Sequence, residues 1–148
     1  MKENIIDDET IKQIKDFFIQ IDNPTEIILF TQKDNCPSCE DTRQLLMELS
    51  TTSDKLTFSV YDIDVDAALA KKYNIDKVPN IVIAGKTDND ILDYGVRYAG
   101  LPSGHEFGSL IREVVQVSRR DSNLSKDTRD YLGGLTKPIK FLVFFTPT

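Results

Sequence analysis

The 148-residue chain contains no tryptophan, one histidine and two cysteines, so few residues are available for several kinds of site. It has no basic run of five or more residues, and its net charge is −6. Binding to a nucleic-acid backbone depends on clustered Lys and Arg, which counts against nucleic acid as a partner. No stretch of about 18 apolar residues occurs, and the opening MKENIIDDET has no apolar signal-peptide core. We therefore expect a cytoplasmic protein with no membrane partner.

Helix and strand patterns alternate along the chain. Apolar residues at helical spacing predict a helix at 8–21, another that begins near Cys36, and a last one that ends near Arg119. Short apolar or alternating runs predict strands at 26–30, 56–64, 78–85 and 91–100, with a short helix at 66–73. The last two strands suit an antiparallel hairpin, whereas the first two need a right-handed crossover helix. The expected fold class is α/β, with a four-stranded mixed sheet flanked by helices and an extra N-terminal helix.

The motif CPSC lies between the first predicted strand and its helix. A helix N-terminus has unpaired N–H groups and the positive end of the helix dipole, which stabilise a thiolate. Pro37 suits the first helical turn because its φ is already helical and it has no N–H to leave unpaired. The thiolate is the species that attacks a disulfide, so Cys36 is the predicted nucleophile and Cys39 the resolving thiol. This pair would itself be the redox group, with no separate cofactor.

Two other interpretations of CPSC stay open. The CxxC spacing is also half of a common zinc site, but a metal or iron–sulfur site with four cysteine ligands would need two chains. The single histidine, His105, is predicted to be a surface or capping residue at the start of the last helix. Alternatively, the cysteines are incidental and the chain is a module that binds extended peptides without turnover.

The motif KVPN precedes the predicted hairpin. Pro79 fits the first position of a strand because proline has no N–H to give to the ladder. Because it follows a CxxC by about forty positions, we predict that the Val78–Pro79 bond is cis and turns the backbone of Val78 toward an extended peptide. We assign Val78 and Pro79, together with Pro37 and Ser38, as substrate-binding residues, and we assign no metal ligand.

With CPSC after a strand, KVPN before a hairpin and a closing helix, the chain resembles the thioredoxin and glutaredoxin superfamily. More narrowly, KYNIDKVPNIVI and YGVRYAGLPSGHEF look like the protein disulfide oxidoreductase family of archaea and thermophilic bacteria, whose members join two thioredoxin-like units. The resemblance implies a thioredoxin-like fold and thiol–disulfide exchange with protein substrates. It makes Cys36 the nucleophile, Cys39 the resolving cysteine and Pro79 the cis-proline, with a thioredoxin-reductase-type protein as an electron donor.

The chain departs from this resemblance at the residue expected to accept a proton. Thioredoxins usually carry a buried Asp six positions before the first cysteine, where this chain has Phe30. Another base must then take the proton from Cys39, either water or a nearby carboxylate. Asp62 and Asp64, at the end of the second strand, are weak candidates, and solvated strand-end charges are their simpler interpretation.

The second departure is length. We assign residues 1–119 to a thioredoxin-like redox unit, and residues 120–148 to a linker helix and the first strand of an incomplete second unit. KPIKFLVFF repeats NPTEIILF, because Pro24 and Pro138 are 114 positions apart, and the same step from Cys36 passes beyond Thr148. A strand rich in Phe and Val without neighbours favours edge pairing, so we expect self-association through this C-terminal strand.

Overall fold

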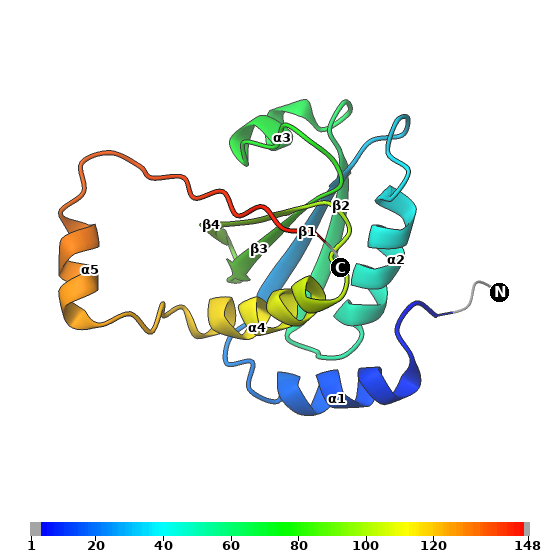
Figure 1. Cartoon of the computed structure of the whole chain (residues 1–148), viewed down its shortest axis with the longest axis horizontal. Helices are drawn as coiled ribbons and strands as arrows, with labels where there is room; N and C mark the ends of the chain where they lie inside the picture. The colour runs from blue at the N-terminus through cyan, green and yellow to red at the C-terminus, as the bar shows by residue number, and fades with distance from the viewer. Residues whose placement is uncertain (1–3, 147–148) are drawn as a thin grey trace.

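The computed structural model describes residues 4–146, which form a four-stranded sheet with helices on both faces (Figure 1). The helices are α1 (Asp8–Phe18), α2 (Cys39–Ser50), α3 (Ala67–Lys72), α4 (His105–Arg119) and α5 (Lys126–Gly133). The strands are β1 (Thr25–Thr31), β2 (Leu56–Asp62), β3 (Asn80–Lys86) and β4 (Ile91–Ala99). Elements follow one another in the order that the apolar patterns predict.

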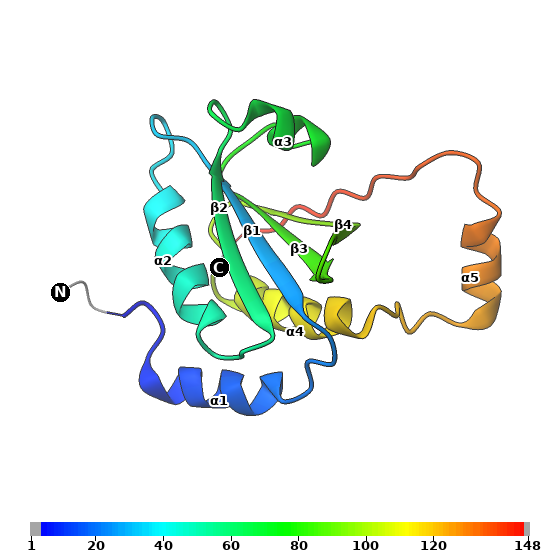
Figure 2. The same ribbon diagram turned by 180° about the vertical axis from the view of Figure 1, so that it is seen from behind.

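The strand order is β2-β1-β3-β4, which places the first strand inside the sheet. β1 and β2 are parallel, with Thr25 opposite Leu56, and α2 connects them (Figure 2). β3 is antiparallel to both β1 and β4, and Asn80 lies opposite Phe30. The mixed sheet expected from the sequence, with its C-terminal hairpin, is therefore confirmed.

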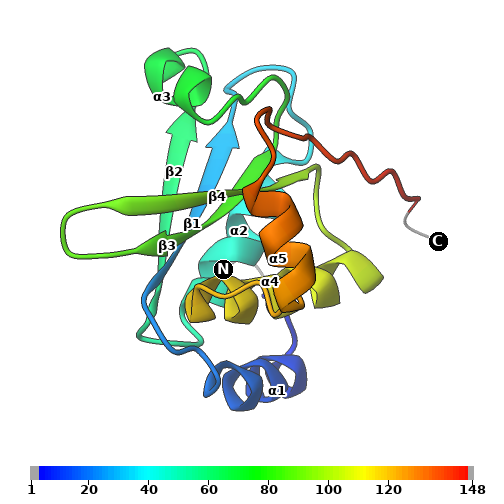
Figure 3. The ribbon, with the colours of Figure 1, turned by 90° about the vertical axis from the view of Figure 1, so that its left-hand side faces the viewer.

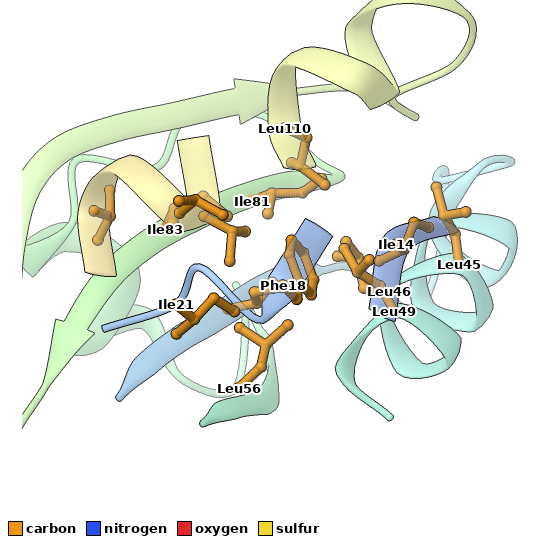
Figure 4. Packing of buried hydrophobic residues seen from close by; sticks show 14 of the residues in the cluster. Ile14, Phe18, Ile21, Leu45, Leu46, Leu49, Leu56, Ile81, Ile83 and Leu110 are labelled. Atoms are coloured by element: carbon orange, nitrogen blue, oxygen red, sulfur yellow. The ribbon is translucent and has the colours of Figure 1, made fainter. Parts of the chain in front are cut away.

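One face of the sheet is covered by α1, α2 and α4, and the larger core cluster lies there (Figure 4). Leu29 of β1 and Ile81 of β3 are fully buried in this cluster with Leu46 of α2 and Leu110 of α4. Burial of each such side chain contributes about 1.5–3 kcal/mol. This face is therefore the larger source of hydrophobic stabilisation, and it holds α2 in place.

The opposite face carries a smaller cluster, which α3 covers (Figure 3). Phe30 is fully buried there, and its ring centroid lies 5.9 Å from that of Tyr61 and 5.8 Å from that of Tyr73. Side chains alternate along a strand, so Leu29 packs on the α2 side of the sheet and its neighbour Phe30 on the α3 side.

Some predicted boundaries differ from the structure. α1 ends at Phe18 and not at residue 21, because the Gln20 and Ile21 N–H groups donate to carbonyls three residues back, in turns that follow the helix. α2 begins at Cys39 and not near Cys36, because the Cys39 N–H donates to the Cys36 carbonyl oxygen at 3.2 Å in a turn that precedes the helix. The segment 137–145, expected as a strand, forms no ladder within residues 4–146, since a ladder needs a neighbouring strand. The sheet is complete before α4 ends at Arg119, while the assignment of residues 120–148 to a second unit stays a prediction.

The helices within residues 4–146 are all too short or too polar to cross a lipid bilayer.

Glu26 and Lys86 form an ion pair on the α3 side of the sheet, with Nζ 2.7 Å from Oε2. The Glu26 side chain is only 9% exposed, and the Thr57 hydroxyl also donates to its carboxylate. Burial by itself raises the pKa of Glu26, but the hydrogen bonds from Lys86 and Thr57 outweigh it, so the pKa lies below its ordinary value of 4.5. The cluster thus joins β1, β2 and β3 through a carboxylate that is charged at neutral pH.

Replacing Lys86 by methionine is expected to destabilise the fold by about 1–3 kcal/mol at neutral pH, because it leaves the Glu26 carboxylate short of a donor. The Lys86 side chain is 36% exposed, so water replaces part of the lost interaction and favours the low end of this range. In the native chain the pKa of Glu26 is depressed, so its contribution is present above pH 4.5 and is lost as pH falls through the folded-state pKa.

Urea unfolding at several pH values measures this effect. The difference between Lys86→Met and the native chain should shrink as the pH falls below 4.5, because burial without the Lys86 donor favours protonation of Glu26 in the variant and so removes the stranded charge. Lys86→Arg keeps the donor and is the matched control. A loss that is equal at acidic and neutral pH would show that Lys86 acts through packing alone.

Candidate active site

Cys36 and Cys39 form a disulfide where the chain enters α2, with their Cα atoms 5.4 Å apart. Cys36 is partly exposed, whereas Cys39 is 7% exposed on the inner face of the helix. Thr42, one turn further on, is fully buried, and its N–H and hydroxyl both donate to the Ser38 carbonyl oxygen, at 3.0 and 2.7 Å. The first cysteine can therefore be reached from outside while the second is shielded, an asymmetry that suits an attacking and a resolving thiol.

A left-handed turn at Asn35 leads into the disulfide. β1 ends at Thr31, and a loop of residues 32–35 follows, in which Asn35 has a φ of 61°. Asn takes this conformation several-fold more often than most residues other than Gly. Asn35 was not among the predicted site residues, although an Asn next to a cysteine at a strand–helix junction is a signal for such a turn.

Pro37 and Ser38 occupy the turn between the two cysteines. Pro37 is exposed and lies before the helix, not in its first turn as predicted, because α2 begins one residue after Ser38. Ser38 is the N-cap residue, but its hydroxyl makes no capping hydrogen bond. The amide end of α2 therefore lies at the disulfide without a side-chain cap, and both residues follow the partly exposed Cys36.

The Val78–Pro79 peptide bond is cis, as predicted. Pro79 is buried and its carbonyl oxygen accepts from the Gly100 N–H at 2.9 Å, whereas Val78 is partly exposed. The pairing of Asn80 with Phe30 places Pro79 beside the C-terminal end of β1, the end from which the chain leads to Cys36. The structure thus brings the two predicted motifs to the same end of the sheet, and the substrate-binding roles of Val78 and Pro79 stay predictions.

Position 30, singled out as the place of a missing carboxylate, lies on the wrong side of the sheet to serve Cys39. Cys39 starts the inner face of α2, whereas Phe30 packs under α3. The last buried residue of β1 on the α2 side is Leu29, which is also apolar. A position counted back from the cysteine does not by itself fix the face of the strand, because a shift of one residue moves a side chain to the other face.

The carboxylates of Asp62 and Asp64 are held in the turn that follows β2. Asp62 Oδ1 accepts from the Asp64 N–H at 2.9 Å and from the Val65 N–H at 3.3 Å. Asp64 Oδ2 accepts from Gln32 Nε2 at 3.0 Å. The bonds of Asp62 are those of a local turn, whereas Asp64 binds the loop between β1 and α2, and water is the simpler proton acceptor for Cys39.

The described residues offer few groups of side chains that could bind a metal ion. Among residues 4–146, no three or more His, Cys, Asp or Glu side chains gather in a way that could hold a metal ion. His105 is exposed at the first position of α4, which agrees with its prediction as a surface residue. A metal site bridging two chains through CPSC would have to draw its other ligands from the second chain.

The sheet topology, the CxxC at the start of the first crossover helix and the cis-proline opening the hairpin define a thioredoxin-like fold. The model of the glutaredoxin-like domain family (DUF836) matches residues 26–108, which include both motifs. The chain therefore belongs to the glutaredoxin-like domain family, and the resemblance drawn from the sequence is confirmed. Together with the Cys36–Cys39 disulfide, this membership identifies a thiol–disulfide redox domain.

Curated relatives are longer proteins. The F subunit of alkyl hydroperoxide reductase in Pseudomonas putida is 26% identical over 140 residues, which are 94% of this chain and 24% of the relative. The protein of the same name in Staphylococcus epidermidis is 39% identical over 54 residues, 36% of this chain and 11% of the relative. The chain thus spans about a quarter or less of the length of these relatives.

Solved structures support the fold. A protein disulfide oxidoreductase from Aeropyrum pernix K1 superposes with a TM-score of 0.77 at 24% identity, covering 89% of this chain and 57% of the other. The N-terminal N/C domain of alkyl hydroperoxide reductase from Enterococcus faecalis gives a TM-score of 0.76 at 22% identity, covering 89% and 62%. At these identities the likeness establishes the thioredoxin-like fold alone.

Proposed function

We propose that the chain is a protein-disulfide oxidoreductase that works through the CPSC dithiol. The observation that carries the proposal is the asymmetry of the pair, with a partly exposed Cys36 and a buried Cys39 at the amide end of α2. Val78, partly exposed beside the cis-proline at the same end of the sheet, offers backbone groups to an extended substrate segment. An accessible sulfur beside such a backbone edge suits protein thiols.

In the reducing direction, the Cys36 thiolate attacks one sulfur of a substrate disulfide. A mixed disulfide forms, and the other substrate sulfur leaves as a thiolate that takes a proton from water. Cys39 then gives its proton to water and attacks Cys36, so the Cys36–Cys39 bond forms and the second substrate thiolate is released. Two electrons pass to the substrate, and the same steps in reverse oxidise a substrate dithiol.

Repeated reduction requires a source of electrons, and we propose a separate reductase module of the thioredoxin-reductase type. Two curated relatives that match 94% and 90% of this chain are named as subunits of an alkyl hydroperoxide reductase, and the chain matches only a fraction of their length. A dithiol domain that receives electrons from a reductase and hands them to another disulfide fits this context. The dithiol pair needs no further cofactor for the exchange itself.

Reduction of insulin by dithiothreitol tests the proposal. The native chain should accelerate it well above the uncatalysed rate, whereas Cys36→Ser should return it to that rate, because the remaining thiol, Cys39, is buried. Circular dichroism would confirm that the variant is folded. Equal activity of the two proteins would overturn the assignment and favour the alternative of a peptide-binding module with incidental cysteines.

A further inference from the structure

The two edges of the sheet differ in how they are protected. At the β4 edge the pairing with β3 shifts register between Ile83 and Ala84, and Gly95 has a φ of 82°. Irregularities of this kind stop a second chain from adding to an edge. β2 forms the other edge, and its seven residues pair one to one with β1 without a bulge, a proline or a lysine. β2 is therefore the edge at which another strand can add.

The backbone of β2 presents regular hydrogen-bonding groups to that edge. The Ile63 N–H donates to the Thr31 carbonyl oxygen, and the Tyr61 carbonyl oxygen accepts from the Thr31 hydroxyl, so these groups face β1. The Asp62 N–H faces away from β1 and donates to the Asp66 carboxylate. Since backbone groups alternate in direction along a strand, the N–H and C=O groups of Phe58 and Val60 face outward.

A strand-forming segment of this chain lies without a neighbouring strand. Residues 137–145, KPIKFLVFF, are called here the C-terminal segment, and its largest apolar side chains are strongly exposed, with Phe141 at 83%, Val143 at 85% and Phe144 at 90%. Lys140, near the start of the segment, lines a pocket with Ile63 and Asp76, and Figure 3 shows the rest of the segment, in red, extending away from β2. The segment is therefore better placed to reach the β2 edge of another molecule than its own.

Charge complementarity sets the direction of pairing. Lys137 and Lys140 stand at the start of the C-terminal segment, while three carboxylates, Asp62, Asp64 and Asp66, stand at the end of β2 and in the turn after it. Opposite charges meet only when the segment runs antiparallel to β2. With Lys140 opposite Asp62, Leu142 lies opposite Val60, and the strand continues toward the start of β2.

This register satisfies the other constraints on an added strand. The outward groups of Phe58 and Val60 then bond to Phe144 and Leu142, neither of which is proline. Pro138, which has no N–H to donate, falls opposite Asp64, beyond the end of the β2 ladder. The apolar side chains of Leu142 and Phe144 come to lie beside those of Val60 and Phe58 at the margin of the main core.

We propose that the C-terminal segment of one copy adds to the β2 edge of a second copy as an antiparallel fifth strand. The exchange is reciprocal, so each chain gives one strand and receives one, and the assembly closes as a two-fold dimer. It buries the exposed phenylalanines of the segment and removes the open edge of β2 at the same time. The dimer leaves the Cys36–Cys39 pair, at the opening of α2, outside the new interface.

Disulfide cross-linking between two different single-cysteine chains tests the register. Both are the full 148-residue chain carrying Cys36→Ser and Cys39→Ser, and one adds Ser59→Cys while the other adds Val143→Cys. These positions face each other as a non-hydrogen-bonded pair, for which the Cα separation is about 4.5 Å and a disulfide can form. Mild oxidation of the mixture should give a covalent heterodimer as the main product.

The matched control replaces Val143→Cys with Leu142→Cys, which the register turns to the other face of the sheet. Its cross-linking with Ser59→Cys should be at least tenfold slower. Equal rates for the two mixtures, or no heterodimer from either, would overturn the proposed register. A single chain carrying both Ser59→Cys and Val143→Cys that cross-links only within itself would show that the segment occupies its own β2 edge and would overturn the exchange.

The mass of the native chain in solution, measured by light scattering over a range of concentrations, gives a second test. The native chain should reach the mass of a dimer, and removal of residues 137–148 should leave a monomer. Val60→Pro removes an N–H that faces outward, and it leaves the hydrogen bonds between β2 and β1 in place. This variant should therefore also be a folded monomer. Lys140→Glu should weaken dimerisation about fivefold at low salt. A native chain that stays monomeric, or a Val60→Pro chain that dimerises normally, would contradict the proposal.

Discussion

Replacing Cys39 by serine is expected to turn the chain from a catalyst of exchange into a trap for its substrates. Cys36 can still attack a disulfide and form the mixed disulfide, but the thiol that would release it is gone. In the native chain the two cysteines are held with Cα atoms 5.4 Å apart, so resolution is intramolecular. An external thiol at millimolar concentration competes poorly with such a neighbour, and release should slow by at least about 10³-fold.

Non-reducing electrophoresis and mass spectrometry measure the trapped complexes. Cys39→Ser should accumulate disulfide-linked adducts that excess dithiothreitol reduces, while Cys36→Ser should form none under the same conditions. The matched comparison matters because both variants lose one sulfur and neither can form the internal disulfide. Adducts of similar amount from both variants would mean that the buried Cys39 is accessible to substrates, against its 7% exposure.

The sheet could be predicted from the sequence because each strand carries its own signal. The apolar run at 26–30 and the alternation from Leu56 to Val60 match β1 and β2, and the short polar turn between β3 and β4 indicated a hairpin. The cis bond at Pro79 was predicted only from its distance to the CxxC and from the resemblance to thioredoxins. A proline at the start of a strand would have favoured trans if taken alone.

Features that depend on three-dimensional neighbours could not be predicted in the same way. The start of α2 depends on a backbone bond between Cys36 and Cys39, which competes with the first helical turn and leaves no trace in residue types. The segment 137–145 has the composition of a strand but no partner within residues 4–146, and composition does not report partners. The face on which Phe30 lies depends on the register of β1, because side chains along a strand alternate and a shift of one residue exchanges the two faces.

Replacing Phe30 by alanine is expected to cost about 3–5 kcal/mol of unfolding free energy and to leave the redox potential of the dithiol unchanged. Phe30 is fully buried, and its loss opens a cavity between the rings of Tyr61 and Tyr73. The cost is a large part of the stability of a small domain, which is typically about 5–15 kcal/mol. Urea unfolding of the oxidised proteins measures it.

The redox potential of the dithiol tests whether Phe30 affects the active site or only the packing under α3. Phe30 lies on the α3 side of the sheet and Cys39 on the α2 side, so a cavity at position 30 does not change the surroundings of the sulfur. Leu29→Ala is the matched variant, because Leu29 is equally buried but lies on the α2 side. The redox potential of the dithiol should shift in Leu29→Ala and stay unchanged in Phe30→Ala. A shift in Phe30→Ala as large as that in Leu29→Ala would show that the two faces of β1 are coupled, and it would contradict the separation of the two faces.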